Sequence, residues 1–190
     1  MNYRRENFKF WIITILFSLL ITFMSCFSHY AKICPNSDAF RILGSYIFYN
    51  ASPSTPRGIY LRVPKLWLSR GDYVIYKPSK ETSTIAFERG WNKRKNMSFL
   101  KRVRGLAGDT YSSDLMDGFY VNGRYFGSIA ILDGKGNLMP MHLGSHHVPL
   151  GEFLPVGENT KSFDGRYTGT VPIENIQAKV IPLFTEAIIP

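Results

Sequence analysis

Residues 99–109 read FLKRVRGLAGD, and their pattern indicates the kind of secondary structure from which the domain is built. Its first six residues alternate between two sets that a β-strand would place on opposite faces: Phe99, Lys101 and Val103 on one, and Leu100, Arg102 and Arg104 on the other. The two glycines that follow predict that the strand ends at residue 105 and that the chain then reverses. The pattern therefore predicts a strand with Lys101 on an apolar face, although a lysine on a strand is more often exposed.

Short alternating runs of the same kind recur along the chain between glycine and proline residues. They cover residues 58–63, 72–76, 119–121 and 171–180, with a further candidate strand at residues 44–48. Residues 80–97 form a long excursion in which Phe87 and Trp91 are candidates to cover a substrate or dip into a membrane. Short runs with frequent glycine and proline are typical of β-rich domains, so we predict a mainly β fold.

A second informative stretch, NASPSTPRGIY at residues 50–60, contains a candidate nucleophile. Two prolines fix φ on both sides of Ser54, and a glycine allows a sharp exit from the loop. Ser52, two residues earlier, is placed to set its hydroxyl beside the Ser54 backbone N–H, where a second donor of an oxyanion hole would lie. A turn without chemistry is the commoner outcome for such a composition, so the loop alone leaves both interpretations open.

A serine nucleophile can use a lysine as its base only if the protein buries that lysine. With a pKa near 10.4, only about 0.04% of a free lysine is neutral at pH 7, whereas a decrease of roughly two to three units raises this to about 4 to 30%. The predicted apolar face around Lys101 meets this requirement. Ser54 and Lys101 are therefore a candidate catalytic pair.

A third block makes a resemblance specific. In order, Ser-x-Pro-x-Gly-x-Tyr at residues 54–60, Lys-Arg-Val-x-Gly-Leu-x-Gly-Asp at 101–109 and Ser-x-Asp-x-Arg-Tyr-x-Gly-x-Val-Pro at 162–172 resemble the type I signal peptidase family. The short serine motif and the segment FERGW at 87–91 look most like the TraF-type conjugative-transfer peptidases. The likeness spans nearly the whole chain after residue 45.

The resemblance implies that Ser54 is the nucleophile and Lys101 the general base, with the Ser54 amide and the Ser52 hydroxyl forming the oxyanion hole. It also implies supporting roles for residues behind the site: Ser162 orienting Lys101, Asp164 and Arg166 as a buried ion pair, and Arg102 joined to them through Glu158. The chain departs from the leader peptidases at Glu158, where Asp is usual, and in lacking one residue between Asn159 and Ser162. No cofactor and no metal is implied.

Charge and hydropathy suggest a membrane. The chain carries 23 Lys and Arg against 14 Asp and Glu, a net charge of +9 that would also fit nucleic acid. The basic residues instead gather at two places: Arg4, Arg5 and Lys9 before an apolar segment, and Arg89, Lys93, Arg94 and Lys95 in a predicted loop. We expect membrane lipid and no nucleic acid as partner, while a solvated loop without a partner explains the second cluster equally well.

Residues 10–27 hold no charged side chain over eighteen positions, which is the lower range for a membrane-spanning helix. We predict a cytoplasmic N-terminus at residues 1–9, a transmembrane anchor at 10–27 and a periplasmic peptidase domain at 28–190, because basic residues precede the anchor. The protein would thus be a single-pass protein of the bacterial inner membrane. A cleaved signal peptide is the alternative, although no clear small-x-small site follows.

Neither the cysteines nor the histidines predict a further site. Cys26 and Cys34 would lie about 12 Å apart on a continuous helix, beyond disulfide reach, so we predict no intrachain disulfide. His142, His146 and His147 lack the carboxylate or cysteine partners of a metal site.

The hypothesis from the sequence is a membrane-anchored serine endopeptidase with a signal-peptidase-like antiparallel β-sheet domain and one N-terminal transmembrane helix. Its resemblance to the TraF type implies that it cleaves a pilin precursor and that components of a type IV secretion system are partners. The alternatives are a general leader peptidase for many exported proteins, a catalytically idle scaffold of a secretion complex, and a self-cleaving repressor of the Ser-Lys type.

Overall fold

A computed structural model describes residues 11–12, 14–19, 21–22, 25 and 45–186. The chain divides into two compact units, residues 1–45 and 46–190. The described residues between 11 and 25 are helical. Within the described part of the chain, no helix has the length and apolar character needed to cross a membrane. The anchor predicted at residues 10–27 lies partly outside the described residues, and Cys26 and Cys34 lie outside them altogether.

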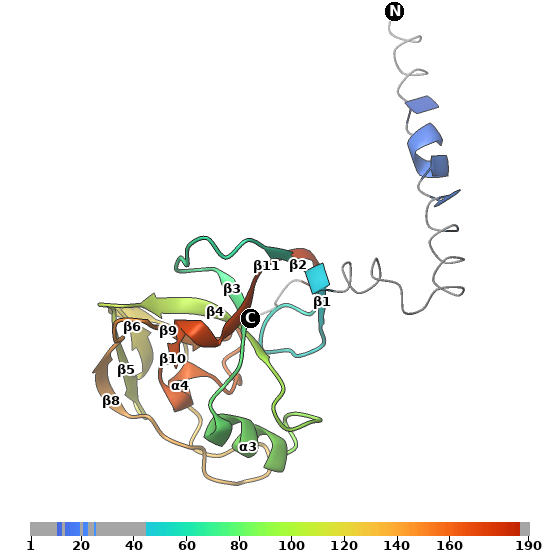
Figure 1. Cartoon of the computed structure of the whole chain (residues 1–190). Coiled ribbons are helices and arrows are strands. Elements are labelled where there is room, and N and C mark those ends of the chain that lie inside the picture. The colour runs from blue at the N-terminus through green and yellow to red at the C-terminus, as the bar shows by residue number, and fades with distance from the viewer. Residues whose placement is uncertain (1–10, 13, 20, 23–24, 26–44, 187–190) are drawn as a thin grey trace, which may run out of the picture. The chain divides into compact units, whose positions relative to one another are not determined.

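The second unit is built from two antiparallel sheets. The larger has seven strands in the order β1 (Ile47–Asn50), β2 (Gly58–Val63), β11 (Ile176–Thr185), β3 (Tyr73–Tyr76), β4 (Phe99–Leu106), β9 (Glu152–Val156) and β10 (Val171–Pro172). The smaller has four strands in the order β7 (Arg124–Tyr125), β6 (Gly118–Val121), β5 (Thr110–Asp114) and β8 (Gly144–His147). Figure 1 shows β5, β6 and β8 at one side of the domain and β1, β2 and β11 at the other. The prediction of a mainly β domain is confirmed.

Strand β4 has the predicted alternation, with every second residue buried from Phe99 onward. The face that carries Lys101 packs in a cluster with Val74 and Tyr76 of β3 and with Phe153 of β9. Arg102 and the other residues of the opposite face are only partly buried. A charged lysine is thus placed in the apolar interior by the two-residue period of the strand.

Several strand boundaries differ from the predictions, and strands β5, β7, β8 and β9 were not predicted. Strand β4 continues to Leu106 because Gly105 lets β9 approach: a Cβ at this position would lie 3.1 Å from the side chain of Leu154. The first strand begins at Ile47 rather than at residue 44. The run at 171–180 is divided by a 3-10 turn, η1 (Ile173–Asn175), because β10 pairs with β9 whereas β11 pairs with β2 and β3.

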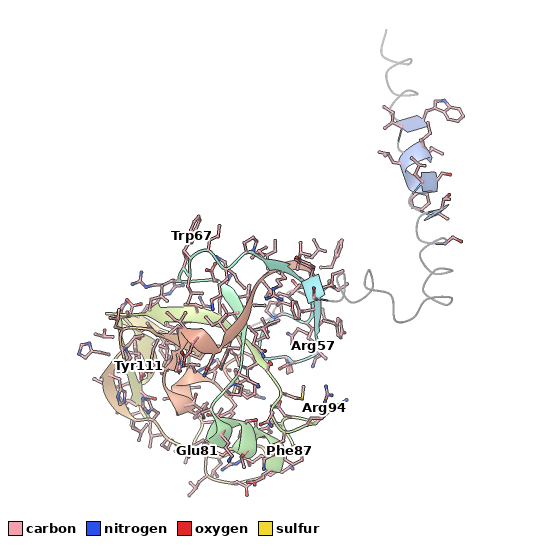
Figure 2. The ribbon with its side chains drawn as sticks, in the orientation of Figure 1. Arg57, Trp67, Glu81, Phe87, Arg94 and Tyr111 are labelled. Atoms are coloured by element: carbon pink, nitrogen blue, oxygen red, sulfur yellow. The ribbon has the colours of Figure 1, made fainter. Side chains whose placement is uncertain are left out.

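The excursion after β3 contains a helix that the sequence did not predict, α3 (Lys80–Glu88). Its polar composition conceals a helical period, but Ser79 caps its N-terminus by accepting a hydrogen bond from the Thr82 N–H at 3.1 Å. Phe87 and Arg94, labelled in Figure 2, lie at the end of the domain that carries α3. Trp91 packs with its ring 4.8 Å from that of Phe163, so this part of the excursion is attached to the domain.

Candidate active site

The serine loop is the connection of a β-hairpin. Strands β1 and β2 are antiparallel, and Asn50 lies opposite Gly58 in the last pair before the connecting loop, which contains Ser52 and Ser54. Gly58 has a φ of +138°, and a Cβ on it would collide with the Phe184 carbonyl of β11. A glycine is therefore required where the loop rejoins the sheet. Arg57, labelled in Figure 2, marks this end of the loop.

The two serines of the loop contact each other. Ser52 Oγ lies 3.0 Å from Ser54 Oγ, and the Ser54 backbone N–H donates to Ser52 Oγ at 3.3 Å. Ser54 is half-buried and Ser52 is exposed. The Ser52 hydroxyl thus lies beside the Ser54 amide and accepts from it, so these two groups would have to turn from each other before both could donate to one oxyanion.

Lys101 is buried, with 4% of its surface exposed. Its Nζ donates a hydrogen bond to Ser162 Oγ at 2.7 Å and lies 5.7 Å from the centre of the Phe99 ring. Burial is the main cause that lowers the pKa of Lys101 to about 8. The negative charge of Asp164 raises this pKa, and the positive charge of Arg166 lowers it by a smaller amount. At this pKa about 9% of the lysine is neutral at pH 7, so the interior supplies a usable base.

Behind Lys101, Asp164 and Arg166 form an ion pair whose side chains are both fully buried. Asp164 Oδ1 accepts from Arg166 Nε at 3.0 Å, and Asp164 Oδ2 accepts from Arg166 Nη2 at 2.9 Å. Arg166 also donates to the carbonyls of Gly157, Asn159 and Thr160. Asp164 caps α4 (Gly165–Thr168) by accepting from the Arg166 N–H. The ion pair therefore fixes the backbone of residues 157–160, which leads to Ser162.

This segment also holds the serine loop. The N–H groups of Glu158 and Asn159 donate to the Ser54 carbonyl at 2.9 and 3.3 Å. The Gly157 N–H donates to Asp164 Oδ2 at 2.7 Å, and a Cβ on Gly157 would press on Ser162 and lie 2.7 Å from the Ser54 carbonyl oxygen. Gly157 therefore permits close packing between the serine loop and Ser162.

Arg102 lies on the other face of β4, and its side chain reaches Glu158. Its Nη1 is 2.8 Å from Glu158 Oε1, and the same oxygen accepts from the Tyr73 hydroxyl at 2.8 Å. Burial and the hydrogen bond to Glu158 both raise the pKa of Tyr73, so this phenol stays a donor across the neutral range. Arg102 thus stabilises the backbone segment whose N–H groups donate to the Ser54 carbonyl. Asp164 and Arg166 bond to the same segment, and this segment connects them to Arg102.

The structure brings together Ser52 with Ser54, Lys101 with Ser162, and Asp164 with Arg166. Among the described residues, no direct hydrogen bond joins Ser54 to Lys101: the Ser54 hydroxyl contacts Ser52 Oγ, and Lys101 Nζ donates to Ser162 Oγ. Catalytic hydrogen bonds are often completed only when substrate is present. Chemistry at Ser54 would require its hydroxyl to turn toward Lys101.

Sequence reasoning missed Gly157 and the side chain of Asn50. Asn50 was only the first residue of a loop, yet its amide is the centre of that loop's hydrogen bonds. An asparagine at a strand end before a proline-containing turn was the available signal, because Asn side chains commonly bond to nearby backbone.

The three histidines lie at and before β8. His142 and His146 stack with ring centres 4.1 Å apart, and the Tyr111 hydroxyl lies 2.9 Å from His142 Nε2. Burial, with His146 adding to it, lowers the pKa of His142. In the part of the chain that the structure describes, no group of three or more His, Cys, Asp or Glu side chains is arranged to hold a metal ion.

Comparison with known proteins shows the family to which this chain belongs. The family model described as signal peptidase, peptidase S26, matches residues 5–184. The chain therefore belongs to the S26 signal peptidase family and is a serine-type signal peptidase that acts on exported precursors. The crystal structure of a signal peptidase I from Enterococcus faecalis V583 is 20% identical, with a TM-score of 0.36 over 60% of this chain and 96% of that chain. No curated protein matches the chain.

Proposed function

We propose that this signal peptidase cleaves the precursor of a conjugative pilin, with Ser54 as nucleophile and Lys101 as general base. The observation that carries the assignment is a buried lysine whose pKa is lowered to about 8 and which is hydrogen-bonded to Ser162, next to the serine loop. The pilin substrate rests on the resemblance of the short Ser54-Thr55-Pro56 motif to the TraF type.

In the proposed mechanism, neutral Lys101 accepts the Ser54 hydroxyl proton as Ser54 Oγ attacks the scissile carbonyl. The Ser54 N–H and the Ser52 hydroxyl, which contact each other in the free enzyme, donate to the oxyanion. The lysine then gives its proton to the departing amine, leaving an acyl-enzyme. A water molecule loses a proton to Lys101 and attacks the ester, which releases the segment N-terminal to the cleaved bond as a carboxylic acid, and Ser54 regains its proton. Ser162 keeps Lys101 Nζ in position through both steps.

We further propose that the protein is a single-pass protein of the bacterial inner membrane, with residues 1–9 cytoplasmic, 10–27 as anchor and 28–190 periplasmic. The described residues of the anchor are helical and carry exposed apolar side chains such as Trp11, Leu16 and Phe17. Strands β1, β2 and β11, next to the serine loop, expose further large apolar residues: Ile47, Tyr49, Ile59, Ile181, Leu183 and Phe184. Such a patch beside the serine loop supports contact with membrane lipid.

The mass of the pilin in cells tests this function. With the neighbouring secretion genes present, we expect the mature mass in wild-type cells and accumulated precursor in Ser54→Ala cells. The mature mass also shows whether a water was lost, which would mean that the acyl-enzyme had closed the pilin into a ring. Equal maturation in both strains would overturn the pilin assignment. Accumulation of many other exported precursors in the mutant would instead indicate a general leader peptidase.

The pH dependence of cleavage tests the role of Lys101. Only the neutral lysine can accept a proton, so kcat/KM should fall about tenfold per unit below the pKa of about 8 and level off above it. The measurement is the initial rate of precursor cleavage between pH 6 and 9.5. A rate that still rises steeply at pH 9.5 would show that Lys101 titrates like an exposed lysine, and a flat profile would remove it as the base.

A further inference from the structure

The side chain of Asn50 is the hydrogen-bonding centre of the serine loop. Its Nδ2 lies 3.0 Å from the Ser52 carbonyl, 3.2 and 3.0 Å from the carbonyl and Oγ1 of Thr55, and 3.0 Å from the Pro56 carbonyl. Its Oδ1 accepts from the Ser52 N–H at 3.0 Å. Asn50 is buried, with 9% of its surface exposed. One carboxamide therefore contacts backbone on both sides of Ser54.

These contacts act on the groups that would bind an oxyanion. Asn50 bonds to both the N–H and the carbonyl of Ser52, and so fixes the residue whose Oγ lies 3.3 Å from the Ser54 amide. On the other side it holds Thr55, which is 1% exposed. The direction of the Ser54 N–H is set by the peptide units that flank it, and Asn50 fixes the backbone on each side.

The strand pairing explains why the carboxamide can reach these groups. Asn50 is the last residue of β1 and pairs with Gly58, so its Cα position is set by the sheet. The Tyr60 hydroxyl donates to the Pro56 carbonyl at 2.7 Å and supports the same loop from β2. Burial raises the pKa of Tyr60 to about 12, which keeps this donor protonated. Side chains of Asn50 and Tyr60 therefore hold the loop to the sheet.

We propose that Asn50 is a positioning residue for catalysis: its carboxamide sets the geometry of the oxyanion hole formed by Ser52 and the Ser54 amide. This inference rests on the proposed function, since it requires Ser54 to be the nucleophile. Asn50 does not contact Lys101, so its role is separate from the titration of the base.

The test is Asn50→Asp in the purified full chain, with the precursor that accumulates in Ser54→Ala cells as substrate. Aspartate has the shape of asparagine and keeps the oxygen that accepts from the Ser52 N–H. Its second oxygen replaces the Nδ2 donor and would face the backbone carbonyls of Ser52, Thr55 and Pro56. We expect kcat to fall about 10²-fold, as for the loss of one oxyanion donor, with KM nearly unchanged and the pH midpoint still at about 8. Asn50→Asp and Ser52→Ala together should be little worse than either alone, because both act on one group.

Asn122→Asp is the matched control. Asn122 is also a hydrogen-bonding centre, accepting from the Thr110 N–H at 2.9 Å and donating to Asp109 Oδ1 at 2.7 Å, but it lies between β6 and β7. Its replacement should lower the melting temperature and leave kcat of the folded enzyme unchanged. If Asn50→Asp behaves in the same way, Asn50 is merely structural and the proposal is overturned.

Two further variants keep the test decisive. If Asn50→Asp does not fold, Thr55→Val replaces it, because it removes one of the four acceptors of Asn50 Nδ2. We expect kcat to fall about fivefold, the equivalent of one hydrogen bond of about 1 kcal/mol, and an unchanged kcat would overturn the proposal. Ser54→Ala is measured alongside. Full activity of Ser54→Ala would refute the proposed function itself, whereas an inactive Ser54→Ala with a fully active Asn50→Asp would refute only the role of Asn50.

Discussion

Lys101→Met is expected to abolish precursor cleavage and, at pH 7, to make the protein more stable. Methionine fills nearly the same volume without a charge, so the base is lost while the apolar surroundings of Val74 and Phe99 are kept. General-base catalysis is worth about 10²–10⁴-fold in rate, and cleavage should fall by at least this factor. Because Lys101 is buried and its pKa is lowered from 10.5 to about 8, holding it protonated destabilises the fold by about 3 kcal/mol.

The pH dependence of this stability gain has a definite sign. Between pH 8 and 10.5, the unfolded chain keeps the lysine proton and the folded chain does not, so wild-type stability rises with pH across this window. The advantage of Lys101→Met should therefore be greatest below pH 8 and disappear above pH 10.5. Thermal melts of both proteins at pH 7 and pH 10.5 measure it.

Lys179→Met is the control for this experiment. Lys179 Nζ lies 2.7 Å from Asp72 Oδ2, and its side chain is 15% exposed. Its replacement by methionine therefore removes one partner of an ion pair, whereas Lys101→Met removes a buried charge that has no such partner among the described residues. Its melting temperature should fall slightly or stay the same. A Lys101→Met protein that melts below wild type at pH 7 would show that the hydrogen bond to Ser162 outweighs the cost of burying the lysine.

Asp164→Ala is expected to lower stability by about 3–5 kcal/mol, because it leaves Arg166 charged and unpaired in a fully buried position. The loss also frees the Gly157 N–H, and with it the segment that binds the Ser54 carbonyl. For a domain of this size, we expect a decrease of about 6–20 °C in melting temperature together with loss of cleavage. Differential scanning calorimetry and the rate of precursor cleavage are the measurements.

Arg70→Ala provides the comparison. Arg70 forms a bidentate ion pair with Asp109, but its own side chain is 58% exposed. Although Asp109 is buried, it keeps hydrogen bonds from the Leu106 N–H and Asn122 Nδ2, so the removal of Arg70 should cost less than the removal of Asp164. Similar melting temperatures for Asp164→Ala and Arg70→Ala would mean that water reaches Arg166 and that the ion pair is not structural.

The sequence predicted the parts of the fold that follow from local alternation. Strand β2 has the expected bounds, and Lys101 is buried because the period of β4 places it beside Phe99 and Val103. Local patterns could not predict that β4 continues past Gly105 to Leu106, because this depends on how closely β9 packs against Gly105. Helix α3 was missed for a similar reason, since its stability comes from a serine cap and from the packing of Ala86 rather than from an apolar stripe.

At the site, sequence motifs identified the side chains but not their contacts. Ser162, Asp164 and Arg166 could be named from their order in the chain, whereas the link from Arg166 to the Ser54 carbonyl passes through backbone groups that no motif records. Asn50 was overlooked because its partners become neighbours only once β1 and β2 have paired. Contacts made by backbone across distant segments depend on the finished fold.

Gly157 has a consequence for how this enzyme can be altered. The contact between the serine loop and Ser162 depends on a position where the side chain is a single hydrogen atom, and even a methyl group there would push Ser162 and the Ser54 carbonyl apart. Every substitution at Gly157 enlarges the side chain, so mutation can only widen this separation. Variants selected for new substrates should therefore accumulate changes in the surrounding strands while residue 157 stays glycine.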